Sequence, residues 1–362
     1  MKRFLFLPAA AIALFGAVGL LGAPGVSAAD PAPLVVKVGD GQPGYAVTQF
    51  LPSNVTIQTG STIEFDFAWF ELHHIALFEG DGPASKPAET PSPATFPNPS
   101  GYVFSGDING DPANPTKYMI KFAKAGTYTY HCFIHPGMDA SVKVVDAGSA
   151  GAGSIDNQLS ATARANAQYN SGIVQIKEIG AGLKGAPDAS KPGGGKTVES
   201  VLGNFTPGIG QVLQFAPSTI NVREGDSVRW VSQDGAPHDV VFGAPPQASP
   251  FEFPGAKSGS SYDGTKPTAS SIISQDDFGP TTAKSFELVF TKAGSYNYIC
   301  LLHADQGMVG TVVVQARGTT APLPPNTGTG RFGDGLTGWY IIIGALLLAA
   351  GVGASGVAKA RR

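Results

Sequence analysis

The chain has few residues that can bind a soft metal or form a disulfide. Its 362 residues include 2 cysteines, 6 histidines and 4 methionines. Two cysteines cannot build the multi-bridge framework that holds small secreted domains together. Charge is also sparse, because only 14% of residues are charged and the formal net charge is -3. Since no sizeable basic cluster lies outside the termini, we expect no nucleic-acid partner.

Glycine and proline are abundant, with 48 and 29 residues respectively, which favours a turn-rich all-β fold over a helical one. Alternating apolar and polar residues predict short strands in both halves of the chain. These strands are Val55–Ile57, Thr62–Phe67, Ile75–Phe78, Tyr118–Phe122, Thr127–Cys132 and Ser141–Val145, then Ile220–Val222, Ser227–Val231, Val240–Phe242, Ser285–Phe290, Ser295–Cys300 and Gly310–Val314. Many short strands separated by turns are typical of a β-sandwich.

The chain contains an internal repeat, because segments of its first half have similar counterparts in its second half. The segment Phe50–Gly60 is repeated as Phe215–Gly225, and Phe122–Tyr130 is repeated as Phe290–Tyr298. Self-similarity over segments this far apart indicates two copies of one fold.

We therefore expect two tandem β-sandwich domains, at residues 32–146 and 197–315. Residues 147–196 are expected to form a linker, in which Ile155–Tyr169 has the composition of a short helix that acts as a spacer. Residues 316–338 form a second expected linker.

Both ends of the chain carry targeting patterns. Residues 1–29 have the basic start, apolar stretch and small-residue exit of a secretory signal peptide. Residues 339–358 form an apolar run closed by basic residues, which predicts one membrane span with the bulk of the chain outside. The segment Leu323–Gly328 resembles a sortase sorting signal whose pattern Pro324 breaks. We expect a secreted protein anchored at the cell surface, with cell-wall attachment as the alternative.

Each repeat places a cysteine, a histidine and a methionine on one short loop after a strand. These residues are Cys132, His135 and Met138 in the first copy and Cys300, His303 and Met308 in the second. A type 1 (blue) copper site needs one thiolate, two imidazoles and a weak axial thioether. The loops supply three of these four ligands, so the repeat predicts two copper sites, one in each domain.

The remaining imidazole of each site must come from an earlier strand. In the second copy the candidate is His238, and the first copy offers two neighbours, His73 and His74. Aligning His73 with His238 places the apolar residues that follow on the inward face and leaves His74 in the polar position of Asp239. This alternation favours His73 as the ligand, with His74 as the alternative.

The motif Gly-x-Tyr-x-Tyr-x-Cys-x-x-His followed by Met occurs in both copies and resembles that of the cupredoxins. The Cys300–Met308 loop is similar in length to that of plastocyanins, and the Cys132–Met138 loop to that of amicyanins. The resemblance implies two Greek-key β-sandwiches, each with one copper for one-electron transfer. It further implies transient docking with redox protein partners and no enzymatic activity.

Three other interpretations are open at this point. The two cysteines could form a disulfide, although this would not explain the histidine three residues after each of them. The chain could bind or buffer copper without carrying electrons. It could also be a two-domain copper oxidoreductase that uses His131, since a histidine beside the type 1 cysteine binds catalytic copper in nitrite reductases and multicopper oxidases. No His-Cys-His or His-x-His pattern is present to complete such a site.

Overall fold

The computed structural model describes residues 32–80, 86–146, 155–186, 188–190, 195–245, 251, 253–319 and 322–326. All of these except Ala32 belong to one structural unit, Pro33–Arg362. The expected signal peptide and the expected membrane span lie outside the described residues. Within the described ranges, no helix is both long enough and apolar enough to cross a bilayer.

The first repeat forms two facing sheets. Its strands are β1 Leu34–Gln42, β2 Tyr45–Leu51, β3 Asn54–Gln58, β4 Thr62–Phe67, β5 Leu72–His73, β6 Ala76–Phe78, β7 Ala94–Phe96, β8 Tyr102–Phe104, β9 Ile108–Asn109, β10 Thr116–Phe122, β11 Gly126–His131 and β12 Asp139–Val145. One sheet has the order β2-β1-β4-β10-β7 and the other β3-β12-β11-β6-β8, while β5 pairs with β9. We call this part the first sandwich.

The second repeat has the same arrangement and is called the second sandwich. Its strands are β13 Ala189–Ser190, β14 Lys196–Thr206, β15 Gly210–Ala216, β16 Thr219–Arg223, β17 Ser227–Val231, β18 Val241–Phe242, β19 Ser260–Tyr262, β20 Thr268–Ala269, β21 Ser285–Phe290, β22 Gly294–Ile299 and β23 Val309–Gln315. One sheet has the order β15-β14-β17-β21-β19, with β13 beside β14, and the other β16-β23-β22-β18-β20. The described chain is thus mostly β, as the composition predicts.

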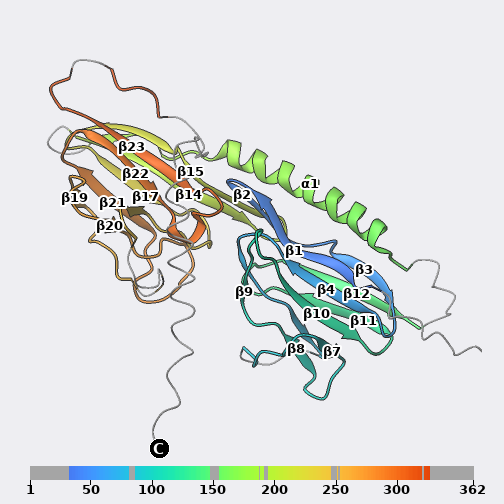
Figure 1. The fold of residues 1–362 in the computed structure, drawn as a ribbon. Helices are drawn as coiled ribbons and strands as arrows, with labels where there is room; N and C mark the ends of the chain where they lie inside the picture. The colour runs from blue at the N-terminus through green and yellow to red at the C-terminus, as the bar shows by residue number, and fades with distance from the viewer. Residues whose placement is uncertain are drawn as a thin grey trace, which may run out of the picture. The chain divides into compact units, whose positions relative to one another are not determined.

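One sheet of the first sandwich joins one sheet of the second through strands β2 and β15. These strands pair antiparallel, with Gln211 opposite Ala46 and Val212 opposite Tyr45 (Figure 1). The result is a continuous 11-stranded sheet.

The strands predicted from alternation all occur, with ends that differ by at most two residues. In β21, for example, Phe286, Leu288 and Phe290 point inward and the residues between them are more exposed. Strands β2 and β15 were not predicted, because nearly all their residues are buried and the alternation that marks a half-exposed strand is absent.

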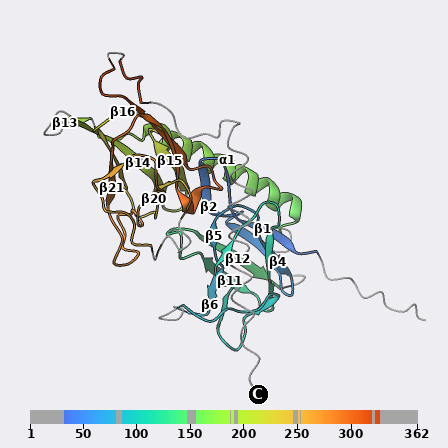
Figure 2. The same cartoon turned by 60° about the vertical axis from the view of Figure 1, so that its left-hand side comes forward.

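The long helix α1, Gln158–Gly182, covers the outer face of this joint. It begins at Asn157, whose side chain accepts a hydrogen bond from the Ser160 N–H in a capping box. Its Ile173 and Ile176 pack in one cluster with residues of β2 and β15 (Figures 1 and 2). The helix is therefore longer than the expected spacer, and it buries an apolar face against both sandwiches.

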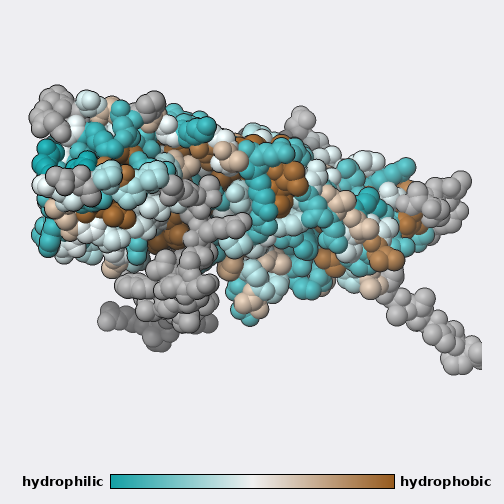
Figure 3. Space-filling view, turned by 90° about the horizontal axis from the view of Figure 1, so that it is seen from above, coloured by the Kyte–Doolittle hydropathy of each residue, from teal (hydrophilic) through white to brown (hydrophobic). Residues whose placement is uncertain are grey.

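Each sandwich encloses its own apolar core. Tyr130 contacts Phe50 and Phe65 edge to face, with ring centroids 4.8 and 5.1 Å apart, and Tyr298 contacts Phe215 at 4.6 Å. Both tyrosines lie two residues before the cysteine of the same repeat, so the cores fix the strands that carry the thiols. On the face drawn in Figure 3, brown apolar residues are scattered among teal hydrophilic ones.

Candidate metal centres

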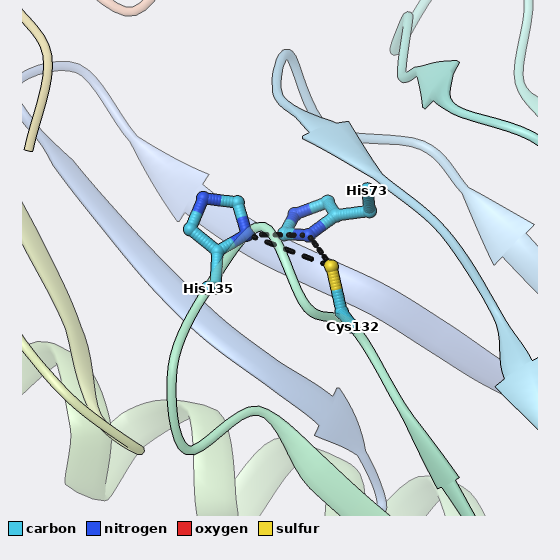
Figure 4. Close-up of side chains that lie close together, drawn as sticks. All are labelled: His73, Cys132 and His135. Atoms are coloured by element: carbon cyan, nitrogen blue, oxygen red, sulfur yellow. Dashed lines mark hydrogen bonds between the residues drawn. The ribbon is translucent and has the colours of Figure 1, made fainter. Parts of the chain in front are cut away.

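The first site is formed by His73, Cys132 and His135. His73 ends β5, whereas Cys132 and His135 lie on the loop after β11, and the three side chains converge (Figure 4). The Cys132 Sγ lies 3.7 Å from His73 Nδ1 and 3.8 Å from His135 Nδ1, and the two Nδ1 atoms are 3.1 Å apart. All three residues are buried.

The second site is formed by His238, Cys300 and His303. His238 precedes β18, Cys300 follows β22, and His303 ends a short 3-10 turn, Leu301–His303. The Cys300 Sγ lies 3.9 Å from His238 Nδ1 and 3.4 Å from His303 Nδ1. These residues are buried as well. Both cysteines are free, so the disulfide interpretation is wrong.

The spacing of these donor atoms fits a bound metal ion. An ion at about 2.0 Å from two nitrogens and about 2.3 Å from one sulfur, in a near-trigonal plane, sets its donors roughly 3 to 4 Å apart. The sulfur–nitrogen separations in both sites and the nitrogen–nitrogen separation in the first run from 3.1 to 3.9 Å. Two imidazoles and one thiol form the donor set that suits copper in a type 1 site.

The predicted methionines end the same loops. Met138 and Met308 are buried in the cores that also contain the cysteines. The N–H of Cys132 donates to the Met138 carbonyl at 3.0 Å, and the N–H of Cys300 donates to the Met308 carbonyl at 3.0 Å. A backbone hydrogen bond between the cysteine and the methionine therefore closes each loop and keeps these two residues close together.

Two glycines make room for the deeply buried imidazoles. Gly39 and Gly203 have φ of +70° and +55° and lie at register shifts in β1 and β14. A Cβ on Gly39 would lie 2.5 Å from His73 Nε2, and one on Gly203 would lie 3.0 Å from His238 Nε2. Only glycine suits both the backbone conformation and the available space.

His74 lies outside the first site and acts on the loop instead. Its Nε2 accepts a hydrogen bond from the Phe133 N–H at 2.9 Å, and its Nδ1 lies 3.1 Å from Asp107 Oδ1. In the second sandwich Asp239 Oδ1 accepts from the Leu301 N–H at 2.5 Å. Both side chains thus hold the residue that follows the cysteine, which is the role expected of the shared polar position.

Burial sets the protonation of the donor groups. It raises the pKa of the Cys132 thiol to about 11 and that of Cys300 well above its usual value. It lowers the pKa of His73 and His135 to about 3. Without metal the thiols are therefore protonated and the imidazoles are neutral at pH 7, so metal binding must displace a thiol proton at each site.

We expect the metal-free protein to lose stability on mild acidification. Burial also lowers the pKa of His303 to about 4 and that of His238 well below its usual 6.5. Between about pH 6.5 and 4 the unfolded chain binds protons at four histidines that stay largely neutral in the folded protein. The stability that they contribute is thus present above pH 6.5 and is lost as the pH falls.

Each of these histidines contributes a slope of about 1.4 kcal/mol per pH unit within that window. The raised pKa values of Glu71 and Asp239 act in the opposite direction and offset part of the effect. Urea unfolding in the presence of a chelator at pH 7, 6 and 5 measures the net slope. His303→Gln should make it shallower, and equal stability at all three pH values would contradict the prediction.

His131 is half-exposed and turned away from the first site. Its Nδ1 lies 2.6 Å from Asp139 Oδ1, and its ring stacks on Phe133 with centroids 5.5 Å apart. Among the described residues, the only groups of three or more His, Cys, Asp or Glu donors close enough to bind one ion are the two sites above. His131 belongs to neither of these groups.

Glu71 is a site residue that sequence reasoning missed. It is buried and lies two residues before His73, with Oε2 3.3 Å from His73 Nε2 and Oε1 3.6 Å from His135 Nε2. The alignment of the repeats places Ala236 at the equivalent position. An acidic residue at a position where the other copy has alanine was the only available signal.

Comparison with known proteins agrees with this geometry. Residues 204–315 match the profile of a family described as copper binding proteins, plastocyanin/azurin family. The chain is 33% identical over 103 residues to chloroplastic plastocyanin of Tetradesmus obliquus, a match covering 28% of this chain and 59% of that protein. It is 32% identical over 103 residues to plastocyanin of Scenedesmus fuscus, covering 28% of this chain and 88% of that protein.

Among solved structures, the chain is similar to amicyanin from Paracoccus versutus, with 22% identity and a TM-score of 0.22. That match covers 32% of this chain and 83% of amicyanin. The chain spans only 59% of the length of the Tetradesmus obliquus protein. The match to the Scenedesmus fuscus protein spans most of its length, and on this ground the chain belongs to the plastocyanin/azurin family, the cupredoxins.

Proposed function

We propose that the protein is an extracytoplasmic electron carrier with two type 1 copper sites. The ligands are His73, Cys132, His135 and Met138 in the first site and His238, Cys300, His303 and Met308 in the second. Secretion and anchoring at the cell surface by residues 339–358 are part of this proposal.

The observation that carries the proposal is the convergence of two imidazole nitrogens and one thiol sulfur in each buried site. Bound copper supplies a one-electron couple. The protein supplies neutral imidazoles, a thiol that becomes a thiolate on binding, and a rigid core that excludes water from them. Because the ligands come from strand ends packed in the cores, little rearrangement is needed between oxidation states.

Exposed apolar side chains beside the first site suit a redox partner. Phe133 is 62% exposed, Leu72 43% and Ile134 37%. Phe133 and Ile134 directly follow the ligand Cys132, and Leu72 directly precedes His73. Electron-transfer complexes use small interfaces that form and separate quickly, so this patch supports transient docking with another redox protein.

Copper reconstitution tests the proposal. We expect two coppers per chain, an intense visible band from each thiolate–copper site, and reversible uptake of one electron per copper. The Cys132→Ser/Cys300→Ser double variant is the control and should stay colourless. Rapid reduction by a reduced soluble haem protein in a stopped-flow experiment would support electron transfer. Tight binding of copper without such exchange would favour copper buffering instead.

A further inference from the structure

Glu71 faces both imidazoles of the first site from the side opposite the thiol. In His73 and His135 the nitrogen nearest the sulfur is Nδ1, so the metal-binding nitrogen is Nδ1 and Nε2 carries the proton. The Nε2 of His73 lies 3.3 Å from Glu71 Oε2, and the Nε2 of His135 lies 3.6 Å from Glu71 Oε1. Carboxylates that accept from the second nitrogen of ligand histidines fix the orientation of the rings and increase their basicity.

The same carboxylate is held by the second sandwich. The Gln211 side-chain N–H, from β15, donates to Glu71 Oε1. Glu71 Oε2 and His73 Nε2 are buried without any other hydrogen-bond partner, so these two atoms, 3.3 Å apart, face each other alone.

The ligand loop of the second site also reaches this region. Gln306, two residues before Met308, donates from Nε2 to the carbonyl of Phe70 at 2.5 Å, and its own carbonyl accepts from the Gly44 N–H at 2.6 Å. Phe70 is the residue before Glu71. A side chain of the second site's ligand loop is therefore hydrogen-bonded to the backbone of the residue that precedes Glu71.

Electrostatic effects extend across the same contact. Burial raises the pKa of Glu71, and the imidazoles of His135 and His303 oppose that rise. In turn, burial lowers the pKa of His303 and the Glu71 carboxylate opposes that fall. The hydrogen bond from Gln306 to Phe70 brings the loop that carries His303 beside the residue before Glu71, so the carboxylate faces the ligands of the first site and lies near the ligand loop of the second.

We propose that Glu71 is a positioning residue shared by the two metal sites, which orients His73 and His135 and places its negative charge where both bound ions interact with it. This inference rests on the proposed function. A negative charge stabilises the more positive, oxidised ion, so Glu71 lowers the reduction midpoints of both sites. The effect is larger at the first site, where the carboxylate also orients the ligands.

Redox titration of the copper-loaded full chain tests this, with each site resolved in a Cys300→Ser or Cys132→Ser background. In Glu71→Ala, which gives the first copy the alanine that the second has, we expect both midpoints to rise, the first site's by more. Visible and electron paramagnetic resonance spectra should change at the first site only. Glu64→Ala is the matched control, because Glu64 is a buried carboxylate of the same sandwich that pairs with Lys117 at 2.6 Å, and it should move neither midpoint.

A second variant covers the case in which Glu71→Ala does not fold. Gln211→Ala removes the amide that holds the carboxylate, so we expect the spectrum of the first site to change although Gln211 lies in the second sandwich. A second-site midpoint that is unmoved or lowered in Glu71→Ala, or an unchanged first-site spectrum in Gln211→Ala, would overturn the shared role. If the unmodified chain did not bind two coppers, the proposed function itself would fail, and this inference with it.

Discussion

Replacing Cys132 by serine should remove half of the bound copper and one of the two visible bands, and Cys300→Ser should remove the other half. A serine hydroxyl has nearly the shape of the thiol but does not ionise to a comparable ligand, and the thiolate is responsible for the intense colour. The loss at the altered site should be complete, since Cys132 and Cys300 are the only cysteines in the chain.

Metal analysis and visible absorption of each variant after copper loading measure this result. The unaltered site is the internal control, because it should keep its copper and its band. Each group of donors is complete within one sandwich, so binding at one site should not require a filled neighbour. Loss of both coppers from a single substitution, or one copper in the unmodified chain, would refute two separate binding sites.

The two neighbouring histidines of the first sandwich should behave very differently. His73→Ala removes a donor whose Nδ1 lies 3.7 Å from the Cys132 sulfur, so we expect the first site to lose its colour. His74→Ala removes only the hydrogen bond to the Phe133 N–H and should leave the colour in place. Loss of such supporting contacts typically weakens metal binding about 10- to 100-fold.

Copper titration monitored at the first site's band, in a Cys300→Ser background, separates the two variants. Asp239→Ala, read in a Cys132→Ser background, is the matched variant of the second site and should resemble His74→Ala, because Asp239 holds Leu301 as His74 holds Phe133. A colourless His74→Ala protein beside a coloured His73→Ala protein would show that the register is shifted by one residue.

The loops and the half-exposed strands could be predicted because their information is local. Cys132 and His135 are three residues apart on one turn, and no distant contact is needed to place them together. The choice of His73 over His74 followed from alternation, since successive side chains of an extended segment point to opposite faces. In the structure His73 lies beside the Cys132 thiol, and His74 contacts Asp107.

The remaining features depend on contacts between the repeats, which local patterns do not encode. Strands β2 and β15 lack alternation because helix α1 covers their second face. Glu71 gains its significance from Gln211, which is far away in sequence and lies across the joint between the sandwiches. An acidic residue in a turn looks like an ordinary solvated side chain until the surface that covers it is known.

The pairing of β2 with β15 has a consequence for how the chain associates with other molecules. These strands hold the same place in the two repeats, and each would be an open sheet edge if its repeat stood alone. An open edge invites pairing with another molecule, and two identical edges that meet antiparallel form an isologous dimer. The tandem chain thus holds within one molecule the edge-to-edge pairing that an isologous dimer would form between two, and neither edge is left open to another chain.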